Sequence, residues 1–302
     1  MPQTFIDPLT DFGFKRLFGS EPNRDLLIDF LNSLLEPRHR IRELTLRRTE
    51  HAGRHAEDRK AFFDVYCVAE SGERFIVEVQ RLWHVNFVDR CLYYSTFAVQ
   101  EQARRGAWDF ELTPVYVVGI LDFMFGDRVA PGEYFHVVEM KDQLGRVFYD
   151  KYKHIYVQLP RFRKADSELA SRADKWFYFL KHVAELSEVP TGFRDNMFEK
   201  AFEEARYADL SPKEREAYEA SVRQSMSIDH AFRSAEARGE ARGEARGEAR
   251  GEARGMARGE RAQAIRIAKR ALADGMTVAQ VAALTSLPES EVRALARGQD
   301  LQ

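Results

Sequence analysis

Two carboxylates and one amide interrupt a pair of otherwise apolar strands early in the chain. The stretch FFDVYCVAESGERFIVEVQR occupies residues 62–81, and Asp64, Glu78 and Gln80 stand within its apolar runs. Burying a carboxylate without a partner is costly, so each acid must meet a cation, a proton or a metal ion. The identity of that partner decides what chemistry this stretch can perform.

A hairpin would bring these three side chains together. A Ser-Gly pair at 71–72 lies in the short connection between the two strands, which favours a hairpin. Side chains alternate between the faces of a strand, so Glu78 and Gln80 share one face and their valine neighbours point to the other. From the neighbouring strand, Asp64 can reach the same face. Mg²⁺ binds in proteins through one or two carboxylates and keeps several waters, so the pattern predicts a Mg²⁺ site that Mn²⁺ could also fill.

Two structural roles for the acids compete with this metal site. Asp64 could bond a core arginine, and Glu78 could face solvent from an edge strand. Both roles would leave the hairpin without a reaction to perform, whereas a bound cation can polarise a phosphate and lower the pKa of an attacking water.

The elements around the hairpin predict a mixed α/β core. Helical periodicity over residues 7–35 predicts two helices broken by GSEPN, and residues 85–105 fit an amphipathic helix ended by Gly106. The run PVYVVGILDFMF at 114–125 suits a strand covered on both faces. Residues 166–223 are expected to be mainly helical. Helices and strands therefore interleave along the chain.

These motifs, in this order, resemble the PD-(D/E)XK nuclease superfamily, whose signature is an Asp followed by Glu-x-Lys on the next strand. With Gln80 in the lysine position, the chain is similar to the recombination-promoting nuclease branch, also described as PD-(D/E)XK family transposases. The stretches that carry the rest of the resemblance are DFGFKRLFG, FLNSLL, DRCLYYSTFAVQEQ, PVYVVGILDF and the C-terminal GMTVAQVAALTSL. The resemblance covers roughly residues 5–200 and the tail, by motif order.

This resemblance implies a restriction-endonuclease-like core, a mixed sheet flanked by helices, with an all-α C-terminal extension. It implies that Asp64, Glu78 and Gln80 are catalytic, and that Asp64, Glu78 and the backbone carbonyl of Val79 hold the metal. Gln80 would orient the water or a phosphate oxygen, but an amide cannot supply the positive charge of a lysine.

Basic residues near these motifs are candidates for contact with DNA. Lys15 stands four residues after Asp11, so an ordinary helical ion pair is the first interpretation and a DNA contact the second. Arg90 has the same two interpretations, since it could contact a phosphate or form a structural ion pair. His84 alone is weak evidence for an acid or base. The segment 38–60 holds eight Lys or Arg against four Asp or Glu, so it could contact phosphates, although a solvated loop is the default.

Composition narrows the class of protein. The net charge of −2 provides no global basic field, so binding to DNA requires a local basic surface. Cys67 and Cys91 have no zinc-like spacing and are expected to be small buried side chains. The N-terminus lacks an apolar signal core, and no stretch approaches ~18 uninterrupted apolar residues. We therefore expect a cytoplasmic protein with no membrane partner.

A tetrapeptide repeat separates the core from the tail. Five copies of Glu-Ala-Arg-Gly run from Glu236 to Gly255, followed by Met-Ala-Arg-Gly. Each glycine costs a helix roughly 0.8–1 kcal/mol relative to alanine, and like charges stand four apart. The repeat is therefore expected to be a weak helix or a flexible tether. Expansion of a short DNA repeat explains its identical copies, and no catalytic role is expected of it.

The tail has the outline of a helix-turn-helix. Thr277 with Gln280, and Ser286 with Glu289, fit capping boxes at the starts of two short helices. Acids at the start of the second helix, including Glu291, would approach phosphates unfavourably, so we favour self-association or regulation over the reading of bases. The predicted domains are a nuclease-like domain at 1–228, the repeat at 229–261 and a helical tail at 262–302, with a homo-oligomer formed through the C-terminal helices.

Two functions follow from these expectations. The first is a metal-dependent DNA endonuclease that hydrolyses phosphodiester bonds in recombination, transposition or defence against foreign DNA. The second is a catalytically inactive nuclease fold that binds DNA or protein. The intact set of Asp64, Glu78 and Gln80 favours the first. Metal-dependent cleavage of plasmid DNA distinguishes the two.

Overall fold

A computed structural model describes residues 3–36, 39–51, 61–103, 106, 108–125, 130 and 132–297. The chain divides into two compact units, Met1–Asp229 and His230–Gln302. The first contains the predicted hairpin, and the second contains the repeat and the tail.

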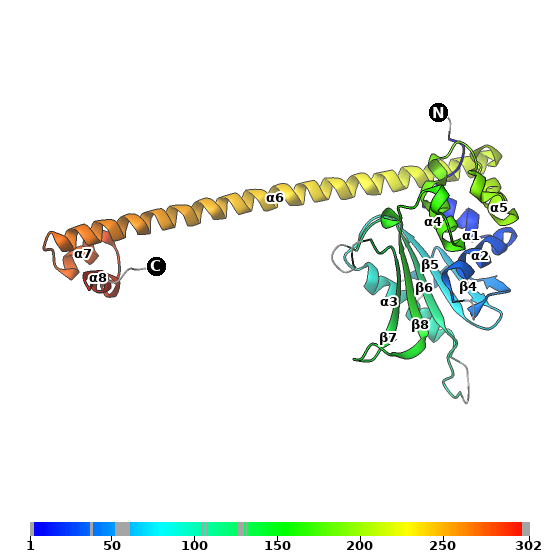
Figure 1. Cartoon of the computed structure of the whole chain (residues 1–302), viewed down its shortest axis with the longest axis horizontal. Coiled ribbons are helices and arrows are strands. Elements are labelled where there is room, and N and C mark those ends of the chain that lie inside the picture. Colours follow the sequence, from blue (N-terminus) through cyan, green and yellow to red (C-terminus); the bar gives the residue numbers. More distant parts are fainter. Residues whose placement is uncertain are drawn as a thin grey trace. The chain divides into compact units, whose positions relative to one another are not determined.

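A six-stranded mixed sheet forms the centre of the first unit (Figure 1). Its strand order is β1-β4-β5-β6-β8-β7. The middle of the sheet is parallel, because β6 pairs parallel with both β5 and β8, and the remaining pairs are antiparallel. The strands are β1 (Leu44–Leu46), β4 (Val65–Ala69), β5 (Arg74–Gln80), β6 (Val115–Leu121), β7 (Phe135–Lys141) and β8 (Val147–Gln158).

Helices cover both faces of this sheet (Figure 1). On one face, Val77 and Val118 share a large core with buried side chains of four helices. These are α1 (Asp11–Phe18), α2 (Arg24–Leu34), α4 (Arg172–His182) and α5 (Asn196–Glu204). On the other face, α3 (Phe87–Gln100) packs over Ile76 and Val117. Short 3₁₀ helices in the connections are η1 (Glu21–Asn23), η4 (Leu159–Arg161), η5 (Asp166–Glu168), η6 (Val183–Glu185), η7 (Thr191–Phe193) and η8 (Tyr207–Asp209).

This arrangement confirms the expected mixed sheet flanked by helices. Every residue of β6 is buried, as its continuous apolar run predicts for a strand covered on both faces. Cys67 and Cys91 are free and buried, so they are the small core side chains that their spacing indicated. Burial raises the pKa of the Cys91 thiol to about 12.

The first strand of the hairpin is shorter than predicted. A continuous strand from Phe62 is wrong, because Phe62 belongs to β3 (Ala61–Phe62), which pairs with β2 (Glu50–His51) as a separate two-stranded sheet. The amide of Phe63 continues this pairing by donating to the carbonyl of Thr49 at 2.9 Å. The main-sheet strand β4 therefore begins one residue after Asp64. The helix after the hairpin also differs, since α3 ends at Gln100 instead of extending to residue 105.

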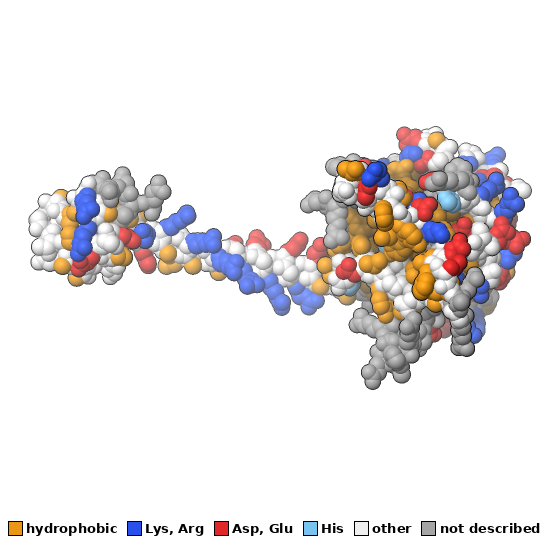
Figure 2. Space-filling view, turned by 90° about the horizontal axis from the view of Figure 1, so that it is seen from below, with side chains coloured by type: hydrophobic (Ala, Val, Ile, Leu, Met, Phe, Trp, Pro, Cys, Tyr) orange, Lys and Arg blue, Asp and Glu red, His pale blue; other side chains and the backbone are white. Residues whose placement is uncertain are grey.

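The second unit is helical. The helix α6 (Pro212–Ala273) begins in the first unit and runs through the whole repeat, where acidic and basic side chains gather on different sides of it (Figure 2). The helices α7 (Val278–Thr285) and α8 (Glu289–Ala296) close a small core with the end of α6. Its buried residues are Ala268, Ala271, Val281, Leu287, Val292 and Leu295.

One of the two predicted capping boxes in the tail is present. Thr277 caps α7 and exchanges hydrogen bonds with Gln280, as expected. The prediction of a capping box between Ser286 and Glu289 is wrong. Ser286 instead ends α7 in the left-handed conformation, with φ of 59°, and α8 starts after Pro288. Among the residues that the structure describes, no helix is long and apolar enough to cross a membrane.

Candidate active site

The β4–β5 hairpin places the two predicted carboxylates opposite each other. Val65 pairs with Val77, so the next positions outward in the same antiparallel register are Asp64 and Glu78. Gly72 makes the tight connection possible because its φ of 96° is one that residues with a side chain rarely adopt. The convergence expected from strand alternation is therefore present in the structure.

A hydrogen bond orients the Asp64 carboxylate toward the second strand. Its Oδ2 accepts from the backbone N–H of Val79 at 2.7 Å. The N–H and C=O of one residue in an extended strand point toward the same neighbouring strand. The carbonyl of Gln80 points the other way, since it accepts from the amide of Asp122 at 2.9 Å. The Val79 carbonyl therefore faces the side of the strand on which Asp64 lies.

Glu78 is a buried acid with an unsatisfied oxygen. The residue is 6% exposed, and its Oε1 has no hydrogen-bond partner among the described residues. Burial, and then the nearby charge of Asp64, raises the pKa of Glu78 well above its ordinary value. Asp64 is partly exposed, yet burial of its carboxyl raises its pKa to about 6, against the lowering effect of the Val79 hydrogen bond.

These two acids fit a small hard cation. An orphaned carboxylate oxygen, a second carboxylate and a carbonyl facing the same region are the oxygen donors that Mg²⁺ prefers, with water completing its shell. Within the described part of the chain, no group of three or more His, Cys, Asp or Glu could hold a metal ion. Two carboxylates and one backbone carbonyl leave room for several waters, which suits Mg²⁺ better than a closed protein cage would.

The amide of Gln80 is engaged at both ends. Its Nε2 donates to the carbonyl of Leu82 at 3.0 Å, and its Oε1 accepts from Nη2 of Arg90. Sequence reasoning assigned Gln80 to a water or a phosphate oxygen, whereas the structure shows it bonded to Arg90, ten residues further along the chain.

The two candidate DNA-contact residues have different surroundings. Lys15 forms the predicted helical ion pair with Asp11, at 2.6 Å. Arg90 lies on α3 beside the carboxylates, and its charge acts to lower the pKa of both Asp64 and Glu78. The basic segment 38–60 lies partly outside the described residues, which there comprise 39–51 only.

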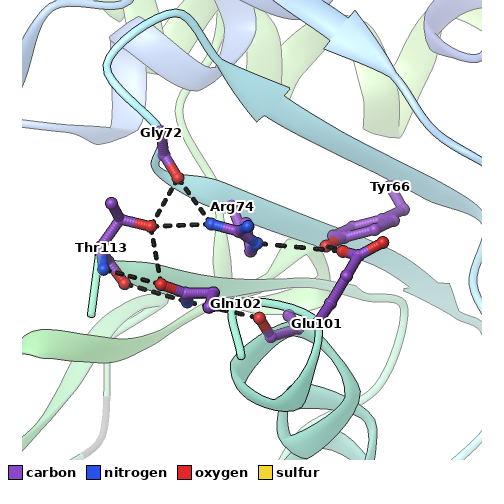
Figure 3. Close-up of polar contacts among 7 residues, drawn as sticks. Tyr66, Gly72, Arg74, Glu101, Gln102 and Thr113 are labelled. Carbon is purple, nitrogen blue, oxygen red and sulfur yellow. Dashed lines mark hydrogen bonds and ion pairs between the residues drawn. The ribbon is translucent and has the colours of Figure 1, made fainter. Parts of the chain in front are cut away.

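A polar cluster at the far end of the hairpin fixes α3 against β5 (Figure 3). Arg74 donates to the carbonyl of Gly72 at 2.9 Å and to the hydroxyl of Thr113 at 2.7 Å. It also lies 3.9 Å from the carboxylate of Glu101, which accepts a hydrogen bond from the hydroxyl of Tyr66. This cluster ties the end of α3 to both hairpin strands and so helps to hold Arg90 over Gln80.

Residues that sequence reasoning missed complete a cleft of about 390 Å³ beside the site. The hairpin contributes Asp64, Val79 and Gln80, and α1 contributes Asp11. The start of α6 contributes four polar side chains, which are Ser221, Gln224, Ser225 and Asp229. They follow no motif and lie more than a hundred residues from the hairpin, so no signal in the sequence marks them.

One of the residues that line this cleft, Arg81, forms an ion pair. Arg81 follows Gln80 directly and bonds the carboxylate of Asp7 at 2.7 Å, which joins the hairpin to the N-terminal segment. Burial raises the pKa of the neighbouring Asp122, while the charge of Arg81 lowers it. Sequence reasoning missed these three residues, although Asp122 carries a signal because it is the one charged residue in the apolar run at 114–125.

Comparison with known proteins agrees with this geometry. No curated protein and no solved structure matches the chain. The family model described as PD-(D/E)XK nuclease family transposase matches residues 8–235, which include the whole hairpin and every element of the sheet. The resemblance and the fold expected from the motifs are confirmed: the chain belongs to the PD-(D/E)XK nuclease family transposases.

Proposed function

We propose that this protein is a metal-dependent endonuclease that hydrolyses phosphodiester bonds in DNA. Membership of a nuclease and transposase family supports a role on DNA. The observation that carries the finer proposal is the pair of opposed carboxylates, in which Glu78 keeps a buried oxygen without a partner among the described residues. A structural acid would have that oxygen satisfied.

Each residue of the site has a role in this proposal. Asp64, Glu78 and the carbonyl of Val79 would hold Mg²⁺, or Mn²⁺ in its place. When bound, the cation supplies Lewis acidity for the phosphate and lowers the pKa of the attacking water. Asp64 is held in position by its Val79 hydrogen bond, so little reorganisation is needed when substrate arrives. We place this activity in recombination or transposition, in keeping with the family description.

Cleavage of supercoiled plasmid tests the proposal. The protein should nick or linearise the plasmid with Mg²⁺ or Mn²⁺ and leave it intact with EDTA. Asp64→Asn and Glu78→Gln keep the size of each side chain but remove its charge, so both should abolish cleavage. Glu203→Gln is the matched control, because Glu203 is exposed on α5.

The outcome also decides between the enzyme and an inactive nuclease fold. Cleavage that survives EDTA, or that persists in both isosteric variants, would remove the metal site from the mechanism. Metal-dependent DNA binding without cleavage by the wild-type protein would favour the interaction protein instead.

A further inference from the structure

Gln80 cannot itself neutralise charge at this site, and its amide is already in use. The Oε1 accepts from Arg90 and the Nε2 donates to Leu82, so both ends of the amide have partners within the protein. The donor to Leu82 fixes which end of the amide faces α3. Gln80 therefore presents its amide oxygen, a hydrogen-bond acceptor, to the guanidinium of Arg90. This hydrogen bond restrains the position of the Arg90 charge.

Arg90 is held from several sides. Its guanidinium carbon lies 5.5 Å from the ring centre of Phe87 and 5.9 Å from that of Tyr94, within the range of cation–π attraction. Its Nε is buried and has no hydrogen-bond partner among the described residues. The packing fixes the plane of the guanidinium, and Gln80 fixes one of its edges.

This placement suits a charged substrate. Two carboxylates would repel a phosphodiester, and a phosphate that gains negative charge during hydrolysis needs a fixed positive group. A guanidinium presents several donors in a rigid plane that matches the oxygens of a phosphate.

We propose that Arg90 is the catalytic cation that contacts the scissile phosphate, and that Gln80 is the positioning residue that aims it. This inference rests on the proposed nuclease function. It assigns to the Gln80–Arg90 pair the charge that the neutral amide cannot provide alone.

Lys15 is the competing source of charge. Its charge also lowers the pKa of both carboxylates. However, Lys15 forms a 2.6 Å ion pair with Asp11, and its side chain is 45% exposed. Asp11 opposes it, since the Asp11 charge raises the pKa of Asp64. The charge of Lys15 is screened by water and paired with Asp11, so it would stabilise a phosphate less than a fixed guanidinium does. Arg90 is therefore the better candidate.

The test combines cleavage with the binding of Mn²⁺ alone, measured by calorimetry without DNA. Arg90→Met should slow single-turnover cleavage on the order of 10²-fold, as the loss of one fixed electrostatic donor does. The same change removes a positive charge beside two carboxylates, so Mn²⁺ should bind several-fold more tightly. A merely structural role would misplace the ligands and weaken Mn²⁺ binding. The two measurements must therefore move in opposite directions.

A second variant restores the charge from the other residue. Gln80→Lys combined with Arg90→Met puts a cation back at the same place, so it should recover much of the rate and return Mn²⁺ affinity toward the wild-type value. Arg146→Met is the matched control, because the Arg146 side chain is 73% exposed and pairs with Asp142 in the connection between β7 and β8, away from the hairpin and α3. It should leave both measurements unchanged.

Each outcome decides the question. If wild-type protein cleaves and Arg90→Met cleaves equally well, the inference is overturned while the nuclease proposal stands. Weaker Mn²⁺ binding by Arg90→Met also overturns it. So does slower cleavage combined with tighter Mn²⁺ binding in Lys15→Met instead of Arg90→Met. If wild-type protein does not cleave at all, the nuclease proposal fails and the inference fails with it.

Discussion

The Oδ2 of Asp64 lies 2.7 Å from the backbone nitrogen of Val79, the residue between Glu78 and Gln80. This single hydrogen bond sets one carboxylate against the strand that carries the other. Both acids have raised pKa values because they are buried, and Glu78 also because Asp64 lies nearby. The protein thus holds two acids together at a cost in stability, which is common where a site is built for function.

The pH dependence of stability should expose that cost. A carboxyl whose pKa is raised on folding stabilises the fold while it is protonated, and this contribution is lost as pH rises. For Asp64 the window runs from its ordinary value of 3.8 to about 6. Asp64→Asn should therefore melt higher than wild type at pH 8 in EDTA, by a few degrees for about 1–2 kcal/mol.

The same comparison at pH 4 supplies the internal control. There the wild-type carboxyl is largely protonated, so the difference in melting temperature between Asp64→Asn and wild type should nearly vanish. Glu203→Gln, a change of the same kind on an exposed surface, is the control for the substitution itself. A difference for Asp64→Asn that is constant between pH 4 and pH 8 would contradict the assignment of the cost to this carboxyl.

Metal should reverse the instability. A ligand that binds only the folded protein stabilises it by about 2.7 kcal/mol at a hundredfold excess over its Kd. We expect Mg²⁺ or Mn²⁺ to raise the melting temperature of wild-type protein at pH 8, and Glu78→Gln to lose this shift because it loses a charged ligand. Scanning calorimetry with and without the ion measures it. An equal shift in Glu78→Gln would place the ion elsewhere.

Gly119 on β6 lies next to Glu78 in the sheet and has no room for a side chain. It pairs with Glu78 in the parallel register of β5 and β6, and a Cβ there would lie 2.7 Å from the ring of Tyr156. Gly119→Ala should destabilise the protein by about 1–3 kcal/mol, because a fully packed neighbour must move. Gly192→Ala is the control, since its Cβ would meet nothing within 4 Å. Denaturant unfolding curves that coincide for the two variants would contradict this packing argument.

The hairpin was predictable because its signals are local. Alternation along a strand assigns Glu78 and Gln80 to one face, and a Ser-Gly connection limits how the strands can pair. The switch from β3 to β4 was not predictable, because Phe62 and Phe63 are as apolar as the residues of β4. Their pairing is decided by Thr49 and Glu50, across a long connection.

The other residues of the site are brought together by contacts between elements that lie far apart in the sequence. The bond between Gln80 and Arg90 depends on how α3 packs over the sheet, which a local pattern does not determine. Ser221 and Gln224 reach the cleft only because α6 lies beside α1 in the first unit. Such polar residues have no periodic or spacing signal, so only the tertiary structure identifies them.

The repeat in α6 poses a separate question about assembly. A repeat of four residues does not match the 3.6 residues of a helical turn, so its glycine stripe advances about 40° around the helix with each copy. A Cβ added at any of the repeat glycines would meet nothing within 4 Å beyond the nearby backbone of its own helix, so the stripe has space beside it. A straight partner helix could follow the stripe for only a few copies. Pairing over the whole repeat would require a right-handed wrap.

Removal of the second unit tests whether it assembles the protein. Truncation after Ser234 deletes the repeat and the small core of α7 and α8. It should therefore lower the number of protomers per particle, obtained from light scattering, and leave plasmid cleavage intact. Replacing the six repeat glycines, Gly239 to Gly259, by alanine separates the two contributions. Alanine stabilises the helix by roughly 0.8–1 kcal/mol per position but fills the stripe. If oligomers persist in the alanine variant and disappear on truncation, α7 and α8 form the contact. An equal number of protomers in all three proteins would rule out an assembly role for this unit.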